Sequence, residues 1–515
     1  MKKLLLLILF TSCSLFASSE ELILPSAPHR GGELSHSFTI VAPPKLQTMA
    51  DRITREVTKK IEAEKLAITN QKLTLLPDYI FFIDDFSTNA NKLRQQLKAS
   101  HAKMLSISSQ ASDKADLVFE TLRKEYYSGQ RPQVSTVFTD GQNGYKSFRI
   151  PSVAITKNGT IVAFTEARAD YKDQAQNDIV ARSSTDGGRT WGELVIVASD
   201  GQASLNNPMA VYVHERDRVI MIYERYPPNT TEGSIAVGIE GGQQCFMKFS
   251  DDGGRTWSVE RDLTRSVKPA DAGAFCSGPG VGIRLTSGAN KGRIVVPMNV
   301  SAPTWYNYLI YSDDLGDTWH QYQGRSSYGT NESGVVQISD TTLLVNARSH
   351  RNTGDTSWTS PAGWNPWNFE KVTRYRANVP VDVAGTTARW HAAEIMEDQP
   401  DPNCQGSIIR IGEFGYGGRS ILLLSNAASN YTFIEKRAYR ATPPMRVNGS
   451  VKLSLDEGKT WVYGKRIYGD RFTESQYSVL VDLGEGKVGC IFEANENIKF
   501  AVFDLCWLTG GEITE

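Results

Sequence analysis

A turn motif that occurs four times is the feature that most constrains the fold of this 515-residue chain. The motif reads Ser-x-Asp-x-Gly-x-Thr-Trp, and its copies occupy residues 184–191, 250–257, 312–319 and 454–461. The first three copies begin 66 and 62 residues apart, and the last gap of 142 residues is close to two such periods, so we expect a degenerate copy near residues 382–387. Self-similarity at a fixed period indicates an architecture of repeated structural units.

The residue types of the motif are those of a tight hairpin turn. Asp accepts hydrogen bonds from turn amides, Gly adopts a positive φ, and Trp covers an apolar layer. Five such turns, each within a unit of several short strands, predict radial repetition of four-stranded sheets. We therefore expect an all-β fold, a six-bladed β-propeller over residues 133–515. The Asp residues are expected to serve the turns, so we predict no metal site and no cofactor.

The first part of the chain has a different pattern of apolar residues. Apolar residues recur every three or four positions over residues 46–61, which is the spacing of a helix that buries one face. Similar patterns follow over residues 89–105 and 112–126, and a β-like stretch covers residues 73–83. We expect residues 20–132 to form a largely helical N-terminal segment of unknown role.

The beginning of the chain predicts export. Lys2 and Lys3 precede an apolar run over residues 4–10, and small residues follow at 17–19, which is the pattern of a signal peptide spanning residues 1–19. Cys13 offers an alternative lipid-attachment site. The expected location is periplasmic, on the cell surface or secreted. No later apolar run approaches the ~20 residues of a transmembrane helix.

Net charge and cysteine spacing bear on which partners and metal sites the protein could have. The formal net charge is -1, so nothing favours a polyanionic partner such as nucleic acid. Five cysteines lie beyond Cys13, an odd number, so at least one thiol is unpaired within the chain. Their spacing matches no zinc pattern. Buried thiols on strands are the expected arrangement, and a disulfide stays open for an exported chain.

Residues 145–152 form the second informative stretch. Arg149 lies in a short apolar strand pattern with no acidic residue within five positions on either side. A guanidinium in such a strand is costly unless an anionic group meets it. Considered alone, Arg149 is more simply explained by a salt bridge from elsewhere in the fold.

Together, the four motifs and the sequence Phe148-Arg-Ile-Pro151 resemble the exo-sialidases, or neuraminidases, of bacteria and animals. The resemblance covers about residues 133–510, and further matching segments lie at residues 277–284, 292–297, 424–427, 476–480 and 491–493. It implies a propeller whose partners are sialylated glycans of glycoproteins, glycolipids or oligosaccharides.

The resemblance also implies a carboxylate-binding site. Sialic acid carries a carboxylate on its anomeric carbon, and three guanidiniums can hold it by charge-assisted bonds. The matching positions are Arg149, Arg348 and Arg446. Glu493 matches the carboxylate that orients the first of these arginines.

The nucleophile implied by the resemblance is Tyr477, with Glu332 as its partner base. A carboxylate nucleophile would meet a like charge on the carbon that it attacks, whereas a neutral phenol beside a base avoids that repulsion. A single Tyr on a strand is by itself more typical of core packing.

The remaining assignments concern the leaving-group side. Arg168 matches an arginine over the hydroxyl side of the sugar, and the acid/base carboxylate is expected in the loop that follows. Asp173 fits best, Asp170 is the next candidate, and Asp178 is expected to start the following strand. Asn207 stands where many relatives have Asp before Pro, near the acetamido pocket.

These residues predict a retaining exo-α-sialidase that acts through a sialyl-tyrosine intermediate. The alternatives are a trans-sialidase with the same residues, in which a sugar replaces water, and a non-catalytic glycan-binding propeller. The motifs alone allow the last of these, and the set of Arg, Tyr, Glu and Asp side chains argues against it.

Overall fold

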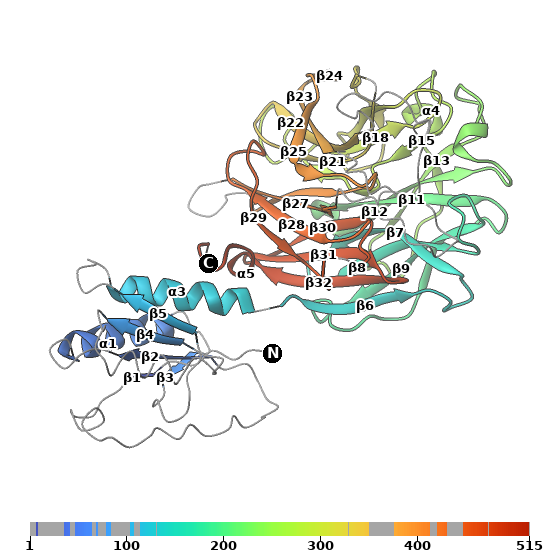
Figure 1. Ribbon diagram of the computed structural model, residues 1–515. Helices are drawn as coiled ribbons and strands as arrows, with labels where there is room; N and C mark the ends of the chain where they lie inside the picture. Colours follow the sequence, from blue (N-terminus) through green and yellow to red (C-terminus); the bar gives the residue numbers. More distant parts are fainter. Residues whose placement is uncertain are drawn as a thin grey trace, which may run out of the picture. The chain divides into compact units, whose positions relative to one another are not determined.

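The structure, a computed structural model, describes residues 7–8, 36–41, 47–63, 68–70, 79–83, 103–107, 114–129, 131–327, 329–349, 375–412, 420–429, 446–471 and 473–513. The chain divides into two compact units. Met1–Arg131 with Thr509–Thr514 form the first, and Pro132–Leu508 with Glu515 form the second (Figure 1).

The first unit contains a parallel sheet in addition to helices. The sheet order is β1 (Leu7–Ile8), β2 (His36–Val41), β4 (Tyr79–Ile83) and β5 (Lys103–Ile107), with β3 (Ile68–Asn70) also paired to β2. The helices are α1 (Gln47–Ala63) and α3 (Lys114–Gly129). Of the apolar stripe predicted for α1, Ile53, Val57 and Ile61 are buried and Met49 is half-buried.

The helices predicted over residues 46–61 and 112–126 correspond to α1 and α3, whereas the helix predicted over residues 89–105 is wrong at its end. Strand β5 occupies the end of the range 89–105, where a helix was expected, and the rest of that range lies outside the described residues. A short apolar run in a parallel sheet is buried on both faces, so its sequence cannot be distinguished from a buried helix by periodicity alone. The predicted signal peptide overlaps β1, and export stays a prediction.

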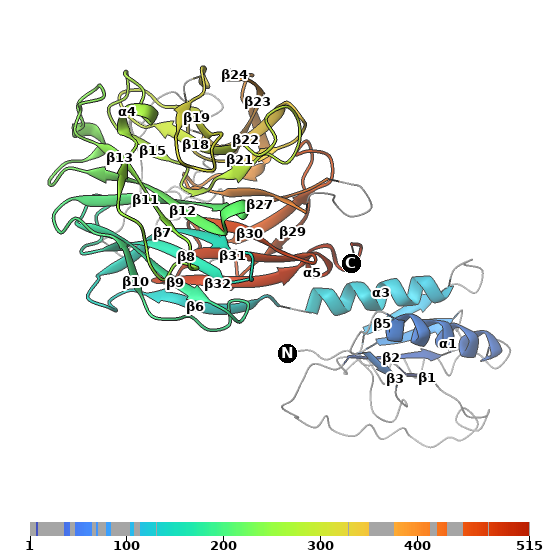
Figure 2. The ribbon, with the colours of Figure 1, turned by 180° about the vertical axis from the view of Figure 1, so that it is seen from behind.

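The second unit is built mainly from antiparallel strands (Figures 1 and 2). Its largest sheet has nine strands: β7 (Ser147–Ile155), β8 (Ile161–Arg168), β9 (Asn177–Ser184), β10 (Val195–Ala198), β11 (Ser204–Val213), β12 (Arg218–Tyr226), β13 (Gln244–Ser250), β14 (Arg261–Asp262) and β16 (Gly280–Val281). Short helices in this unit are η4 (His214–Arg216), η5 (Glu232–Ser234), α4 (Thr264–Val267) and α5 (Leu505–Thr509).

Four smaller sheets follow in chain order. The first has five strands: β15 (Phe275–Ser277), β17 (Ile283–Arg284), β18 (Ile294–Val300), β19 (Tyr306–Ser312) and β20 (His320–Gln321). The second also has five: β21 (Thr330–Gln337), β22 (Thr342–Ser349), β23 (Tyr375–Ala384), β24 (Thr387–Trp390) and β25 (Glu394–Pro400). The third has four strands: β26 (Ser407–Ile411), β27 (Ile421–Ala427), β28 (Gly449–Ser454) and β29 (Val462–Arg466). The fourth also has four: β30 (Ser478–Gly484), β31 (Lys487–Ala494), β32 (Asn497–Asp504) and β6 (Gln133–Thr139).

These sheets form a closed β-propeller arrangement. The early strand β6 completes the last sheet by pairing with β32, which closes the ring. Inner strands of neighbouring sheets contact one another, with β30 beside both β26 and β7, and β21 beside both β18 and β26. Side chains on these inner strands therefore meet, although they come from distant parts of the sequence.

The prediction of six separate blades is not met as stated. Within the described part of the second unit, four separate sheets have the size of single blades, and the fifth sheet has nine strands. Strands β9 and β11 join at one parallel pair, Ser204 and Asn177, which merges two groups of strands into one sheet. Local sequence patterns carry no signal for such a junction.

Each copy of the repeated motif forms a turn between two strands, as predicted. In the first copy, Asp186 Oδ1 accepts hydrogen bonds at 3.0 Å from the N–H groups of Arg189 and Thr190, and Oδ2 accepts one at 2.6 Å from Thr190 Oγ1. The same Asp–Thr bonds recur at Asp252, Asp314 and Asp456. Both carboxylate oxygens serve their own turn, which gives the motif a structural role.

The expected degenerate copy at residues 382–387 coincides with the β23–β24 hairpin, but its Asp does not make the turn hydrogen bonds of the motif. Asp382 accepts hydrogen bonds from Thr342 Oγ1 at 3.0 Å and shares one with His391 Nε2 at 2.7 Å. The period located the turn correctly, whereas the Asp residue bonds elsewhere.

The motif tryptophans pack against strands of the neighbouring sheet or, for Trp257, against the other half of the nine-stranded sheet. Trp191 lies edge-on to Phe500 of β32 with ring centres 5.5 Å apart, and Trp257 lies edge-on to Phe164 of β8 at 5.6 Å. Trp461 packs in a cluster with Leu344 of β22. Aromatic pairs of this kind add to the apolar area that holds adjacent sheets together.

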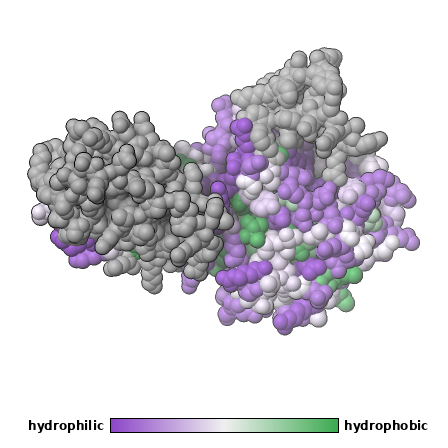
Figure 3. Space-filling view, turned by 60° about the horizontal axis from the view of Figure 1, so that its bottom comes forward, coloured by the Kyte–Doolittle hydropathy of each residue, from purple (hydrophilic) through white to green (hydrophobic). Residues whose placement is uncertain are grey.

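Apolar side chains are concentrated between the sheets. Figure 3 shows mainly hydrophilic residues over the described part of one face, with small hydrophobic patches. Among the described helices, none has the length and apolar character needed to cross a bilayer. Four cysteines are buried free thiols: Cys245, Cys276, Cys404 and Cys490.

Candidate active site

Four of the residues singled out in the sequence meet around a fifth, Tyr477. Arg149 lies on β7, Glu332 on β21 and Arg348 on β22, while Arg446 and Tyr477 lie just before β28 and β30. The guanidinium carbons of Arg149 and Arg446 are 5.6 and 5.4 Å from the centre of the Tyr477 ring. The inner ends of four different sheets therefore supply one cationic site.

A bulge in β7 orients Arg149. The register of β7 against β8 shifts between Arg149 and Ser152, and Ile150 has a φ of 59°. Glu493 Oε1 accepts the Ile150 N–H at 2.7 Å, and its Oε2 lies 2.9 Å from Arg149 Nε. Burial opposes the charged guanidinium, but Glu493 outweighs burial and raises the pKa of Arg149. A bulge at this point redirects the side chain of a strand residue.

Tyr477, Glu332 and Arg348 form a continuous chain of hydrogen bonds. The Tyr477 hydroxyl donates to Glu332 Oε1, and Arg348 Nη1 donates to Glu332 Oε2 at 2.6 Å. Burial and the charge of Glu332 raise the pKa of Tyr477 well above its usual value. The phenol is therefore neutral and already bonded to a group that can accept its proton.

Asn403 is a part of the site that the sequence did not reveal. Its Oδ1 accepts a hydrogen bond from Arg348 Nε at 2.8 Å, and its backbone carbonyl accepts one from Arg446 Nη2 at 2.7 Å. Asn403 has a φ of 60°, and Asp401 Oδ1 accepts the Cys404 N–H at 2.9 Å. This turn thus fixes two of the three guanidiniums. Its sequence, Asp-Pro-Asn, is typical of a turn, but nothing in it indicates that the turn contacts the arginines.

Arg168 is buried and joins two carboxylates. Its Nε donates to Glu166 Oε2 at 2.8 Å, and its Nη1 donates to Asp173 Oδ1 at 2.7 Å. Only 2% of the Arg168 side chain is exposed, against 71% for Asp173. Loss of hydration opposes ionisation of Asp173, but Arg168 and Arg149 outweigh it and lower its pKa.

The other two carboxylates of the loop have different partners. Asp170 Oδ1 accepts the N–H of Tyr171 at 2.7 Å, and Asp178 Oδ2 accepts the Tyr145 hydroxyl at 2.6 Å. Asp178 is the second residue of β9, where a strand start was expected. The contacts of the described residues therefore connect Asp173, rather than its neighbours, to Arg168.

Asn207 is tied to Arg168 through Glu166. Its N–H donates to Glu166 Oε1 at 2.8 Å, and its carbonyl accepts the Ser277 hydroxyl at 2.8 Å. Its φ of 54° falls in the bulge of β11. Ser277 N–H donates to fully buried Glu224 at 2.9 Å, and burial raises the pKa of Glu224 well above its usual value.

Glu232, on η5, is a further carboxylate beside the site. Its side chain is exposed, and loss of hydration raises its pKa to about 7, with the charges of Glu332 and Asp173 adding to the shift. No feature of the sequence distinguished it. Among the described residues, no group of three or more His, Cys, Asp or Glu residues is arranged to hold a metal ion.

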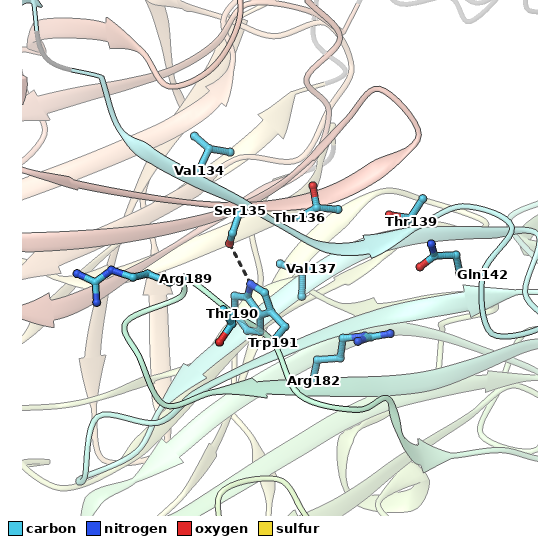
Figure 4. Close-up of a pocket in the computed structure, with 10 residues that line it drawn as sticks. All are labelled: Val134, Ser135, Thr136, Val137, Thr139, Gln142, Arg182, Arg189, Thr190 and Trp191. Atoms are coloured by element: carbon cyan, nitrogen blue, oxygen red, sulfur yellow. Dashed lines mark hydrogen bonds between the residues drawn. The ribbon is translucent and has the colours of Figure 1, made fainter. Parts of the chain in front are cut away.

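A separate pocket of about 470 Å³ lies between β6 and the first repeated motif (Figure 4). Trp191 Nε1 donates to Ser135 Oγ at 2.9 Å within it. Its lining is Val134, Ser135, Thr136, Val137, Thr139, Gln142, Arg182, Arg189, Thr190 and Trp191, so none of the residues around Tyr477 contributes to it.

Comparison with known proteins shows what the chain as a whole is similar to. A family model described as BNR repeat-like domain matches residues 159–490. A sialidase of Micromonospora viridifaciens is 29% identical over 392 residues, which is 72% of this chain and 53% of that protein. A sialidase of Paraclostridium sordellii is 29% identical over 395 residues, which is 72% of this chain and 87% of that protein. The chain thus spans about half the length of the first relative and most of the second.

Solved structures agree on the fold. The Hadza microbial sialidase Hz136 has a TM-score of 0.60 at 24% identity, and the match covers 72% of this chain and 68% of that one. The intramolecular trans-sialidase from Ruminococcus gnavus has a TM-score of 0.58 at 18% identity, covering 73% of this chain and 98% of that one.

Proposed function

Because the chain belongs to the sialidase family of glycoside hydrolases that carry a BNR repeat-like domain, we propose that it is an exo-α-sialidase. It releases terminal sialic acid from glycoconjugates. The observation that carries this proposal is the convergence of Arg149, Arg348 and Arg446 on Tyr477, whose hydroxyl is bonded to Glu332. A cationic site beside a phenol and base suits a substrate with a carboxylate on the reacting carbon.

The three guanidiniums bind the substrate carboxylate. Each is held by partners among the described residues: Arg149 by Glu493, Arg348 by Glu332 and Asn403, and Arg446 by Asn403 and Gln476. Because these partners fix the guanidiniums before the substrate arrives, little ordering is required on binding. The anomeric carbon is thereby placed beside the Tyr477 hydroxyl.

Tyr477 acts as the nucleophile and Glu332 as its base. The Tyr477 oxygen bonds to the anomeric carbon as its proton passes to Glu332, and the bond to the leaving sugar breaks. Water then attacks the sialyl-tyrosine from the opposite face, so two inversions give net retention. Arg348 bonds Glu332 throughout, which keeps the base oriented.

Asp173 supplies the proton to the leaving oxygen and later activates the water. With no substrate bound, Arg168 and Arg149 favour its ionised form. The substrate carboxylate offsets part of that positive charge, which favours protonation of Asp173 when the acid is needed. Arg168 and Asn207 line the side of the sugar that carries its hydroxyl and acetamido groups.

The similarity to sialidases also supports a six-bladed propeller. Eight strands of the nine-stranded sheet form two meanders, β7 to β10 and β11 to β14, connected by the single pair Ser204 and Asn177, and the ninth strand, β16, pairs with β11. Counting each meander as a blade gives the six-bladed propeller. Each meander also carries its own copy of the repeated motif, which supports this count. Residues 132–508 form the catalytic part. Residues 1–19 are a signal peptide that directs export.

The second candidate function is a trans-sialidase reaction, because an intramolecular trans-sialidase shares this fold at a TM-score of 0.58. Product analysis on sialyllactose separates the possibilities. Free sialic acid supports hydrolysis, whereas an anhydro or transferred sialic acid supports the second candidate. If pure protein releases neither lactose nor a sialic acid product, the proposed function is wrong and a non-catalytic propeller is the alternative.

A further inference from the structure

Asp173 lies on an exposed loop. Residues 169–173 are all exposed, and the Asp173 carboxylate contacts buried protein through Arg168. A general acid has to stay within hydrogen-bond reach of the leaving oxygen, and a small displacement of such a group costs rate. The loop therefore requires an attachment that fixes the backbone of Asp173 itself.

Two buried side-chain amides bond the backbone carbonyl of Asp173. Asn177 Nδ2 and Asn206 Nδ2 each donate to that one oxygen at 2.8 Å. Asn177 is fully buried and Asn206 is 3% exposed. A carbonyl oxygen has two lone pairs, so the two amides satisfy it completely.

The two amides come from strands that meet beneath the loop. Asn177 begins β9 and Asn206 lies on β11, and these strands join at the pair Ser204 and Asn177. Ser204 Oγ donates to Asn206 Oδ1 at 2.7 Å, which turns the NH₂ group of Asn206 towards Asp173. The junction between the two meanders thus presents both donors to the acid loop.

An Asn at position 177 lowers stability, so a purely structural role does not explain it. Its Oδ1 is buried without a partner among the described residues. A buried polar atom without a hydrogen bond lowers stability. An amide at this position therefore costs stability while it supplies one donor to Asp173.

We propose that Asn177 and Asn206 are positioning residues for the general acid, which hold the Asp173 backbone so that its carboxyl reaches the glycosidic oxygen. The inference rests on the proposed function, because it assigns the acid role to Asp173. It differs from a structural role in one measurable respect. Misplacing an acid harms substrates with poor leaving groups and spares those with good ones.

The test measures kcat/KM of Asn206→Ala on sialyllactose and on an aryl sialoside. The sugar leaving group needs the proton and the phenolate needs it much less. A displacement of about 1 Å in a reacting group can cost roughly 10²-fold, so the loss on sialyllactose should exceed the loss on the aryl substrate by at least about tenfold. In an Asp173→Ala background the same change should add less than about twofold, because residues that act through one another are not additive.

Matched variants separate positioning from folding. Asn378 is a buried Asn that donates to the Gly458 carbonyl at 3.1 Å, in a different sheet, and Asn378→Ala should lower activity on both substrates equally, if at all. Ser204→Ala keeps Asn206 but removes the bond that orients it, and should shift the substrate ratio in the same direction. It provides the readout if Asn206→Ala fails to fold.

Equal losses on both substrates in the folded Asn206 and Ser204 variants would overturn the inference, and so would a further large loss in the Asp173→Ala background. Either result leaves the proposed function standing. If wild-type protein cleaves neither substrate, the proposed function fails first and the inference fails with it.

Discussion

Replacing Arg348 with Lys tests whether a planar fork is required at this position. Arg348 uses Nε for Asn403 at 2.8 Å and Nη1 for Glu332 at 2.6 Å, which leaves Nη2 for the substrate carboxylate. A lysine ammonium keeps the charge but cannot reach all three partners. The loss of one charge-assisted bond is worth ~1.5–3 kcal/mol, so kcat/KM should fall roughly 10- to 150-fold.

The assay is kcat/KM on an aryl sialoside, with the melting temperature measured in parallel. Arg255→Lys, on an exposed turn residue of the second repeated motif, is the matched control and should behave as wild type. A folded Arg348→Lys variant with wild-type kcat/KM would refute the assignment of Arg348 to the carboxylate site. A large fall in melting temperature with an unchanged kcat/KM would refute it equally.

Three further predictions follow from the site and the division of the chain. Asp173→Ala should lose roughly 10²–10⁴-fold in kcat/KM on sialyllactose and far less on an aryl sialoside, whereas Tyr477→Phe should damage both; equal effects of the Asp change on the two substrates would contradict the acid role. Glu232 has a pKa raised to about 7, so it is protonated below that pH and becomes an anion above it, which repels the substrate carboxylate. KM measured across pH 5–9 should therefore rise through about pH 7 in wild type and stay flat in Glu232→Gln, and the same rise in both proteins would exclude Glu232 as its source. A chain shortened to begin at Arg131 should fold and cleave a small sialoside, because a propeller is closed by its own strands; an insoluble or inactive product would make the first unit part of the catalytic fold.

The features that the sequence predicted are those whose chemistry is local or whose partners have characteristic neighbours. The motif turns were predictable because Asp186 and Thr190 bond within one turn. The pairing of Arg149 with Glu493, and of Tyr477 with Glu332, was expected from the resemblance, and the structure brings these pairs into contact. The roles of these residues in catalysis stay predictions.

The features that the sequence missed depend on contacts between distant strands. Asn403 bonds arginines 55 and 43 positions away, and no local pattern links them. The junction of β9 and β11 depends on the meeting of Ser204 and Asn177. In the first unit, the strand at residues 103–107 is too short to show a period that separates it from a helix.

The measurement that tests the central claim most directly is mass spectrometry of the enzyme after reaction with a 3-fluorosialyl fluoride. The fluorine beside the anomeric centre slows hydrolysis of the covalent intermediate, so the adduct accumulates. We predict a single fluorosialyl group on the peptide that contains Tyr477, absent from Tyr477→Phe. An adduct on a carboxylate such as Glu332, or full turnover of sialyllactose by Tyr477→Phe, would contradict the account.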